Sequence, residues 1–280
     1  MLYYLSLLMA VYALATLALT ILGTVSSLAR FGAKLMVAYI IMCACALYGV
    51  AASVFLRLFG DVGIAQWTVA RAFRYTLCPA IGVSFEVENE EGMTAERPVV
   101  FVGNHQSELD VLVLGRIFPK YCSVSAKSSL KHMPFLGWFM ASTGTVFIDR
   151  ANRQSALSTF DNAARDMKTR RQSVWIFPEG TRSYATTPMM LPFKKGAFHL
   201  AVQAQVPIVP VVVQNYSHVL NVKARTFESG TVRIKVLPPV PTAGMTGTKE
   251  EIDGLVLKVR TAMVAELEAM GMGGKNGKRE

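Results

Sequence analysis

Residues 98–118 read PVVFVGNHQSELDVLVLGRIF, an apolar run followed by a polar turn and then by a mostly apolar stretch. The apolar run 98–103 predicts a buried strand, and residues 108–118 predict a helix. The polar turn therefore places His105 and Asp110 where a strand gives way to a helix. Such strand-to-helix units are the pattern from which α/β domains are built.

The chain beyond this unit repeats the alternation. Seven apolar runs predict strands over residues 84–88, 98–103, 121–126, 144–148, 173–177, 207–213 and 231–237. Apolar residues spaced three or four apart predict further helices over 153–170, 195–205 and 250–270. We therefore predict an α/β fold, a layered domain with a central mixed sheet of about seven strands flanked by helices. This domain is expected over residues 84–270, with residues 271–280 as a flexible tail.

Two uncharged apolar runs, residues 2–22 and 35–56, precede this domain. At about 1.5 Å per residue, each run is roughly 30 Å long as a helix, which is enough to cross the hydrocarbon core of a bilayer. The sequence therefore predicts a membrane-anchoring helical hairpin over residues 1–60, which either spans the bilayer or dips into one leaflet. A signal peptide is the alternative for the first run, although no basic segment precedes it and a second apolar run follows closely.

Residues 61–83 connect the hairpin to the domain and mix apolar with basic positions. Trp67, Phe73 and Leu77 roughly follow helical spacing, with Arg71 and Arg74 between them. Two interpretations remain open for this segment. It is either an interfacial amphipathic helix whose arginines face lipid headgroups, or an ordinary packed helix.

The charge balance narrows the class of partner. The chain has a net charge of +10, and residues 111–235 hold 17 Lys and Arg against 5 Asp and Glu. Such an excess attracts nucleic acid, phospholipid surfaces or phosphorylated small molecules. A membrane hairpin favours the last two, so we expect a phospholipid bilayer as partner and no nucleic acid. The four cysteines show no disulfide or metal-ligand spacing, which suits a reducing compartment.

His105 and Asp110 are the candidate catalytic pair. Five helical steps separate two side chains by roughly 140°, so the pair cannot share one helix face. The two can meet if His105 lies in the turn and Asp110 in the first helical turn, where the carboxylate accepts the Nδ1–H and leaves Nε2 as a base. The alternative is structural: Ser107 would be the helix N-cap and His105 a loop residue. A base without an enzyme nucleophile implies direct deprotonation of a substrate hydroxyl or of water.

A second candidate site is the stretch VWIFPEGTRS, residues 174–183. Gly180 permits a tight turn whose amides can point at a ligand. Arg182 and the hydroxyl of Thr181 are groups that bind phosphate. Glu179 can hold the loop or accept a hydrogen bond from a substrate hydroxyl. The alternative is a plain tight turn with a surface arginine.

Five stretches occur in the order and at the spacing found in the glycerolipid acyltransferases: NHQSELD, PFLGW, GTVFIDR, FPEGTRS and VPIVPVVV. The chain closely resembles the 1-acyl-sn-glycerol-3-phosphate acyltransferases, lysophosphatidic acid acyltransferases of the fungal type. The resemblance covers roughly residues 65–270. It implies that His105 is the general base and that Asp110 orients it.

The resemblance also implies the substrate-binding residues. Glu179, Gly180 and Arg182 match the block that binds the phosphate of the acceptor. Arg150 and the region of Lys127 match a second block, which is linked to binding of glycerol phosphate. The VPIVPVVV strand matches a block associated with the acyl donor or with the wall of the active site.

The implied reaction moves a fatty acyl group from acyl-CoA to the 2-hydroxyl of 1-acylglycerol-3-phosphate, forming phosphatidic acid and CoA. Acyl-CoA is then a co-substrate, and neither a cofactor nor a metal is expected. The alternatives are a related acyltransferase acting on glycerol-3-phosphate or on another lysophospholipid and, more remotely, a non-enzymatic membrane lipid-binding protein. A hydrolase would need a covalent nucleophile or a metal, and the sequence offers no clear candidate. We expect the endoplasmic reticulum membrane, or lipid droplets, with the catalytic domain facing cytosolic acyl-CoA.

Overall fold

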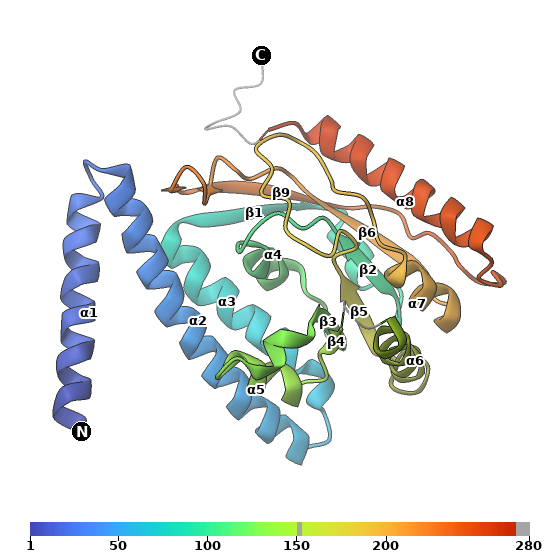
Figure 1. Ribbon diagram of the computed structural model, residues 1–280, viewed down its shortest axis with the longest axis horizontal. Helices are drawn as coiled ribbons and strands as arrows, with labels where there is room; N and C mark the ends of the chain where they lie inside the picture. The colour runs from blue at the N-terminus through green and yellow to red at the C-terminus, as the bar shows by residue number, and fades with distance from the viewer. Residues whose placement is uncertain (150–152, 273–280) are drawn as a thin grey trace.

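A computed structural model describes residues 1–149 and 153–272 (Figure 1). Its centre is a seven-stranded mixed sheet in the order β1-β9-β6-β2-β5-β3-β4. Strands β2 to β6 run parallel, and β9 pairs antiparallel with β6 and parallel with β1. The sheet strands are β1 (Val83–Glu88), β2 (Val100–Gly103), β3 (Cys122–Lys127), β4 (Val146–Ile148), β5 (Ser173–Ile176), β6 (Ile208–Val213) and β9 (Gly230–Val236).

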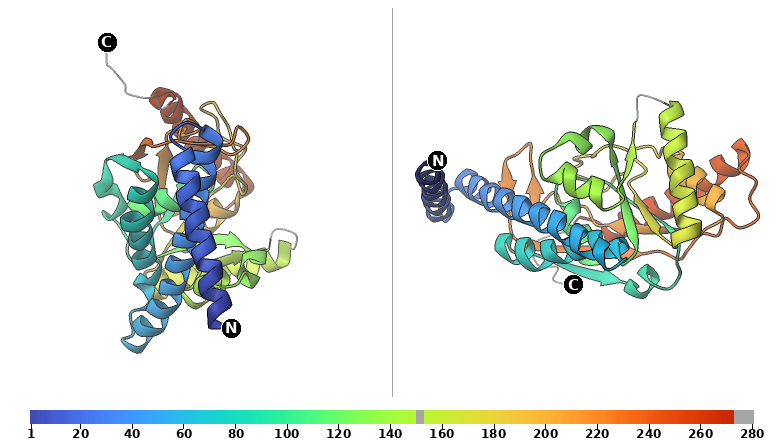
Figure 2. Two further views of the ribbon diagram at one scale, coloured as in Figure 1. Left: turned by 90° about the vertical axis from the view of Figure 1, so that its left-hand side faces the viewer. Right: turned by 90° about the horizontal axis from the view of Figure 1, so that it is seen from below.

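Helices cover both faces of this sheet, as the layered prediction requires (Figures 1 and 2). Helices α2 to α5 pack on one face and α6 to α8 on the other. The helices are α1 (Leu2–Leu22), α2 (Ser27–Leu58), α3 (Ala65–Ile81), α4 (Asp110–Ile117), α5 (Leu136–Ser142), α6 (Arg153–Arg170), α7 (Gly196–Ala204) and α8 (Lys249–Met270). Short 3-10 turns are η1 (Val62–Ile64), η2 (Glu90–Met93) and η3 (Ser128–His132), and β7 (Leu220–Asn221) pairs with β8 (Thr226–Phe227).

The apolar runs that predicted strands are continuous because both faces of the sheet are buried. Side chains alternate between the two faces along each strand. On β2, Phe101 packs with the α3 and α4 layer, whereas Val100 and Val102 pack with α6 to α8. On β5, Trp175 belongs to the first layer and Val174 to the second. All seven predicted strands are therefore present, with ends that shift by a few residues.

The two N-terminal helices are long and apolar enough to cross a membrane, and an 18-residue window reaches a mean hydropathy of 2.3 within Tyr3–Leu22 and of 2.2 within Ser27–Leu58. Helix α1 packs against α2 and stands clear of the sheet (Figures 1 and 2). The predicted hairpin is therefore present. Helix α2 differs from a free membrane span, because it also packs on α3 and on α5 and β8 of the α/β domain.

Polar contacts join α2 to the catalytic domain near both of its ends. Arg30 Nη1 lies 2.7 Å from a carboxylate oxygen of Glu228 near the start of the helix. Near its end, Ser53 Oγ donates to Ser142 Oγ at 2.8 Å, and Arg57 Nη2 donates to the Ser142 carbonyl at 2.9 Å. The catalytic domain thus follows α2 along most of its length.

Helix α3 is packed, and Arg71 does not point outward as the interfacial interpretation expects. Its guanidinium donates to the carbonyl oxygens of Gly115, Arg116 and Phe118 at the end of α4. The last carbonyls of a helix have no partner within the helix, so a neighbouring arginine satisfies them well. The packed-helix alternative therefore accounts for Arg71.

Candidate active site

Two loops at one edge of the sheet bring the two motifs together. One follows β2 and contains His105, and the other follows β5 and contains Arg182. Strands β2 and β5 are parallel neighbours, so their carboxyl ends lie side by side, which is where ligands bind in open α/β sheets. Backbone N–H groups of Ser183 and Tyr184 donate to the carbonyls of His105 and Gln106 at 2.9 and 3.0 Å and hold the loops together.

The structure brings His105 and Asp110 into direct contact. Nδ1 of His105 lies 2.6 Å from Oδ2 of Asp110, and their side chains are 18% and 4% exposed. Helix α4 begins at Asp110, so the carboxylate lies in its first turn. The imidazole stacks on Phe177 of the second loop, with ring centroids 4.2 Å apart. Because Nδ1 is engaged, Nε2 is the ring nitrogen left to meet a substrate.

Ser107 is not the N-cap of this helix, which corrects the structural alternative. The N-cap position is Leu109, and no side-chain cap is formed there. Ser107 Oγ instead accepts from the Leu109 N–H at 3.2 Å. Asp110 Oδ2 also accepts from the backbone N–H of Gln106 at 2.8 Å, so the carboxylate holds the turn as well as the ring.

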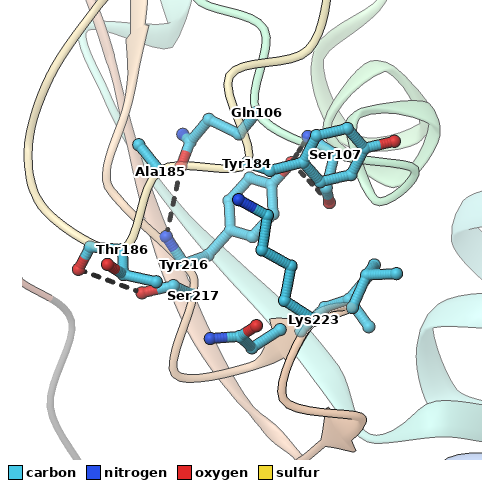
Figure 3. Close-up of a pocket in the computed structure, with 11 residues that line it drawn as sticks. Gln106, Ser107, Tyr184, Ala185, Thr186, Tyr216, Ser217 and Lys223 are labelled. Carbon is cyan, nitrogen blue, oxygen red and sulfur yellow. Dashed lines mark hydrogen bonds between the residues drawn. The ribbon is translucent and has the colours of Figure 1, made fainter.

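Tyr216 is a buried member of the site that the sequence analysis missed. Its hydroxyl donates to Asp110 Oδ1 at 2.7 Å and accepts from the Ser107 N–H at 3.0 Å (Figure 3). Burial, and then the negative charge of Asp110, raises the pKa of Tyr216 well above its ordinary value, so the phenol stays protonated as a donor. Its position in the sequence could have pointed to it, because Tyr216 follows the carboxyl end of β6, and β6 is the other neighbour of β2 in the sheet.

Two amide side chains join the His105 loop to the end of β6. Asn104 forms paired hydrogen bonds with the backbone of Val213, at 2.9 and 2.8 Å. Gln106 Nε2 donates to the carbonyls of Val213 and Gln214, and its Oε1 accepts from the Tyr216 N–H (Figure 3). The polar residues on both sides of His105 thus fix its backbone.

Glu179 is buried, and both of its carboxylate oxygens accept backbone N–H groups. One accepts from His105 at 2.7 Å and the other from Leu191 at 2.8 Å. Burial raises the pKa of this carboxyl, and the two donors act in the opposite direction. Of the two roles proposed for Glu179, holding the loop is the one that its contacts support.

The turn after Glu179 passes through a glycine in the left-handed conformation. Gly180 adopts a φ of +70°, where a side chain would be strained, and a Cβ there would lie 3.0 Å from the Lys194 side chain. Thr181 is exposed. The Arg182 side chain is 43% exposed, and its Nη1 lies 3.1 Å from Glu108 Oε1.

Of the remaining predicted positions, Lys127 lies on a neighbouring strand of the sheet. Lys127 is the last residue of β3, is exposed, and pairs in register with Ile148 of β4. It therefore lies at the same edge of the sheet as the His105 loop, two strands away. Arg150 lies outside the described residues. Lys194 is a cation that the sequence analysis did not single out, and its side chain lies against the turn at Gly180.

A small cavity lies next to the His105 loop (Figure 3). Its volume is about 20 Å³, and its lining includes Ser107, Tyr184, Tyr216 and Lys223. A cavity of this size holds about one water molecule. It is therefore a space beside the catalytic pair and is too small for a lipid or an acyl chain.

The fold and the site define a class of protein: a layered α/β protein with a carboxylate-held imidazole at the carboxyl ends of its parallel strands. The family model described as Acyltransferase matches residues 84–214. Over 227 residues the chain is 46% identical to the 1-acyl-sn-glycerol-3-phosphate acyltransferase of Saccharomyces cerevisiae, covering 81% of this chain and 74% of the relative. The chain belongs to the 1-acyl-sn-glycerol-3-phosphate acyltransferase family, which confirms the resemblance seen in its motifs.

Two further relatives agree with this assignment. Over 196 residues the chain is 40% identical to 1-acyl-sn-glycerol-3-phosphate acyltransferase alpha of Homo sapiens, covering 70% of this chain and 68% of the relative. The crystal structure of PlsC, the 1-acyl-sn-glycerophosphate acyltransferase of Thermotoga maritima, matches with a TM-score of 0.66 and 27% sequence identity. That match covers 84% of this chain and 95% of PlsC.

Proposed function

We propose that this protein transfers a fatty acyl group from acyl-CoA to the 2-hydroxyl of 1-acylglycerol-3-phosphate, producing phosphatidic acid and CoA. The observation that carries the proposal is the 2.6 Å contact between His105 Nδ1 and Asp110 Oδ2, beside the loop that bears Arg182. The names of the relatives support the acceptor, because each is a 1-acylglycerol-3-phosphate acyltransferase.

In the proposed mechanism, Nε2 of His105 takes the proton of the acceptor hydroxyl as its oxygen attacks the thioester carbonyl. The new C–O bond forms first, and the tetrahedral intermediate then breaks its C–S bond and releases CoA thiolate. The imidazolium returns its proton to the thiolate. A thioester is reactive enough that the step requires no metal, cofactor or covalent enzyme intermediate. Asp110 stabilises the imidazolium while it exists.

Three donors converge on the Asp110 carboxylate: the His105 ring, the Gln106 N–H and the Tyr216 hydroxyl. Hydrogen bonds to the ionised form keep a buried carboxylate charged. Glu179 fixes the backbone of His105 from the other side. We propose that this network sets the direction in which the ring presents Nε2, so Tyr216 and Glu179 are positioning residues.

The acceptor phosphate is proposed to bind at the turn that follows β5. Arg182 uses one N–H group on Glu108 and keeps others for a ligand, and the side chain of Lys194 lies against the same turn. Lys127 lies at the same edge of the sheet and is a candidate for the same phosphate or for those of CoA. Arg150 is proposed for this role from its sequence block alone. An acyltransferase that acts on glycerol-3-phosphate remains the alternative, since the same cations suit its phosphate.

We further propose that α1 and α2 lie within one leaflet, which was one of the two placements predicted for the hairpin. Arg30 and Arg57 both contact the catalytic domain, and about 40 Å of helix separates them at 1.5 Å per residue. If α2 crossed the bilayer, the domain surface along it would lie in hydrocarbon, where its irregular polar backbone would lack partners. A shallow position leaves that surface at the headgroups. The domain would then face the cytosol, where acyl-CoA is found, on the endoplasmic reticulum or on lipid droplets.

The test is release of CoA thiol by the full chain in phospholipid vesicles. We expect release only when acyl-CoA and 1-acylglycerol-3-phosphate are both present. Because general acid–base catalysis contributes about 10²–10⁴-fold, His105→Ala should lower turnover by at least two orders of magnitude. Release without an acceptor would indicate a hydrolase, and release with glycerol-3-phosphate alone would move the assignment to the alternative acceptor.

A further inference from the structure

The turn before α5 and the first residues of that helix expose large apolar side chains outside the N-terminal helices. Met133, Phe135 and Trp138 are 45%, 40% and 57% exposed. The rings of Phe135 and Trp138 meet edge to face, with centroids 5.3 Å apart. We call residues 133–138 the aromatic turn. Water-exposed aromatic clusters of this kind are typical of interaction surfaces.

The backbone of the aromatic turn holds these side chains outward at a cost. Phe135 has φ +61° and ψ −60°, and the Leu136 N–H donates to the Pro134 carbonyl at 2.7 Å. This is a γ-turn of the rare, strained kind. A Cβ at Gly137 would overlap the carbonyl oxygen of Lys131, so position 137 requires glycine. Strain at an exposed aromatic residue suggests a function outside the core.

The aromatic turn is firmly attached to α2. Phe139, the first buried ring of α5 after the turn, packs so closely on Gly49 of α2 that a Cβ there would overlap it. The Ser53–Ser142 hydrogen bond closes the far end of the same contact. The apolar face of α2 therefore continues into the aromatic turn. Its exposed members in this half of the helix are Leu47, Tyr48, Val54, Phe55 and Leu58.

The charged side chains that flank the aromatic turn in the sequence are basic. Lys127 and Lys131 are exposed on its β3 side, and the sequence contains no acidic residue between Asp110 and Asp149. Aromatic rings beside cations match the boundary between acyl chains and anionic headgroups. The turn also follows β3 at the edge of the sheet that carries the His105 loop.

From these observations we infer that the aromatic turn is a second membrane-insertion element, which enters the headgroup region of a bilayer that contains anionic phospholipid. The inference rests on the proposed membrane placement of α2. Phe135 and Trp138 would insert, and Lys131 would lie among the phosphates. The catalytic edge of the sheet would then be held against the lipid surface, where the acceptor and the acyl chains reside.

The test uses Trp138 as a depth probe in the full chain, reconstituted in vesicles of phosphatidylcholine with a minority of phosphatidylserine. The chain has three tryptophans, and Trp175 is fully buried. Phosphatidylcholine brominated in the upper acyl chain should quench the Trp67→Phe variant, which keeps Trp138, and should leave the Trp138→Phe variant nearly unchanged. Equal quenching of the two variants would overturn the inference. Shielding of Trp138 from acrylamide without quenching by bromolipid would overturn it too, and would indicate a protein partner.

A kinetic test separates this inference from the proposed function. The variant carrying Phe135→Ser and Trp138→Ser should need about tenfold or more vesicle lipid for half-maximal rate, because burying one large apolar side chain is worth at least that factor. Its rate on water-soluble, short-chain substrates should match that of the parent protein. Leu257→Ser, which changes an exposed leucine of α8, is the matched control and should behave like the parent. An unchanged lipid requirement in the double variant contradicts the inference, whereas a parent protein inactive on both soluble and vesicle-borne substrates contradicts the proposed function.

Discussion

Replacing Tyr216 by phenylalanine tests the hydrogen-bond network behind the catalytic pair. The change removes one of three donors to Asp110 and the acceptor of the Ser107 N–H, and it keeps the buried ring. A hydrogen bond to an ionised group is worth roughly 1.5–3 kcal/mol, and a buried N–H left unpaired costs about 1–3 kcal/mol. We therefore expect the free energy of unfolding to fall by about 2.5–6 kcal/mol, the sum of the two losses.

The kinetic constants of this variant show a positioning role that a loss of stability would not. With one donor lost, the Asp110 carboxylate is held less firmly, so the His105 ring presents Nε2 in the proposed direction less often. We expect kcat to fall by about tenfold, which corresponds to about 1.4 kcal/mol, while the KM for the acceptor stays unchanged. CoA thiol release measured at a temperature where both proteins are folded gives the two constants separately.

A matched variant makes the result decisive. Tyr184→Phe removes a hydroxyl that donates to Glu108 at 2.6 Å, on the exposed side of the site. It should leave kcat nearly unchanged. If Tyr216→Phe also leaves kcat unchanged, or raises only the KM for the acceptor, the proposed role of Tyr216 is wrong.

Three further predictions concern substrate binding, packing and a buried thiol. Arg182→Ala should chiefly raise the KM for the phosphorylated acceptor in the thiol-release assay, and an unchanged KM would remove it from the phosphate site. Gly49→Ala should lower the free energy of unfolding by about 1–3 kcal/mol, and with it the melting temperature, because the new methyl overlaps a ring of α5. Gly32→Ala, whose Cβ meets one side-chain atom at 3.5 Å, should leave the melting temperature unchanged. Burial raises the pKa of Cys78 to about 11, so at pH 9 iodoacetamide should label it far more slowly in the native chain than in the unfolded one. The thiol of Cys78 ionises at lower pH in the unfolded chain than in the folded one, so the free energy of unfolding should fall as the pH rises from about 9 to 11. The Cys78→Ala variant should show a smaller fall over the same pH range.

Much of the fold could be predicted because strands and helices leave local patterns. The apolar period of residues 153–170 predicted α6 with the bounds that the structure has, Arg153–Arg170. The prediction of a helix over 108–118 was less accurate at the start of the helix. The observed helix begins at Asp110, because the Ser107 hydroxyl donates to the Tyr216 hydroxyl and does not cap the helix. Helix ends depend on such tertiary partners, which a periodic pattern does not contain.

In the candidate site, too, contacts within one segment could be predicted and contacts between distant segments could not. The contact between His105 and Asp110 could be predicted, because five residues of turn and helix start decide whether the two side chains meet. Tyr216 could not, since 106 residues separate it from Asp110. Its place depends on the order of strands in the sheet, which sets β6 beside β2.

The sequence by itself determined the alternation of strands and helices, the apolar hairpin and the His105–Asp110 pair, because each arises from spacing within one segment. Only the tertiary structure decided that Arg71 donates to the last carbonyls of α4, that the buried Glu179 accepts from two backbone N–H groups, and that α2 lies along the α/β domain. Each of these depends on contacts between segments far apart in the chain. Long-range packing selects such contacts from many that the same local patterns would allow.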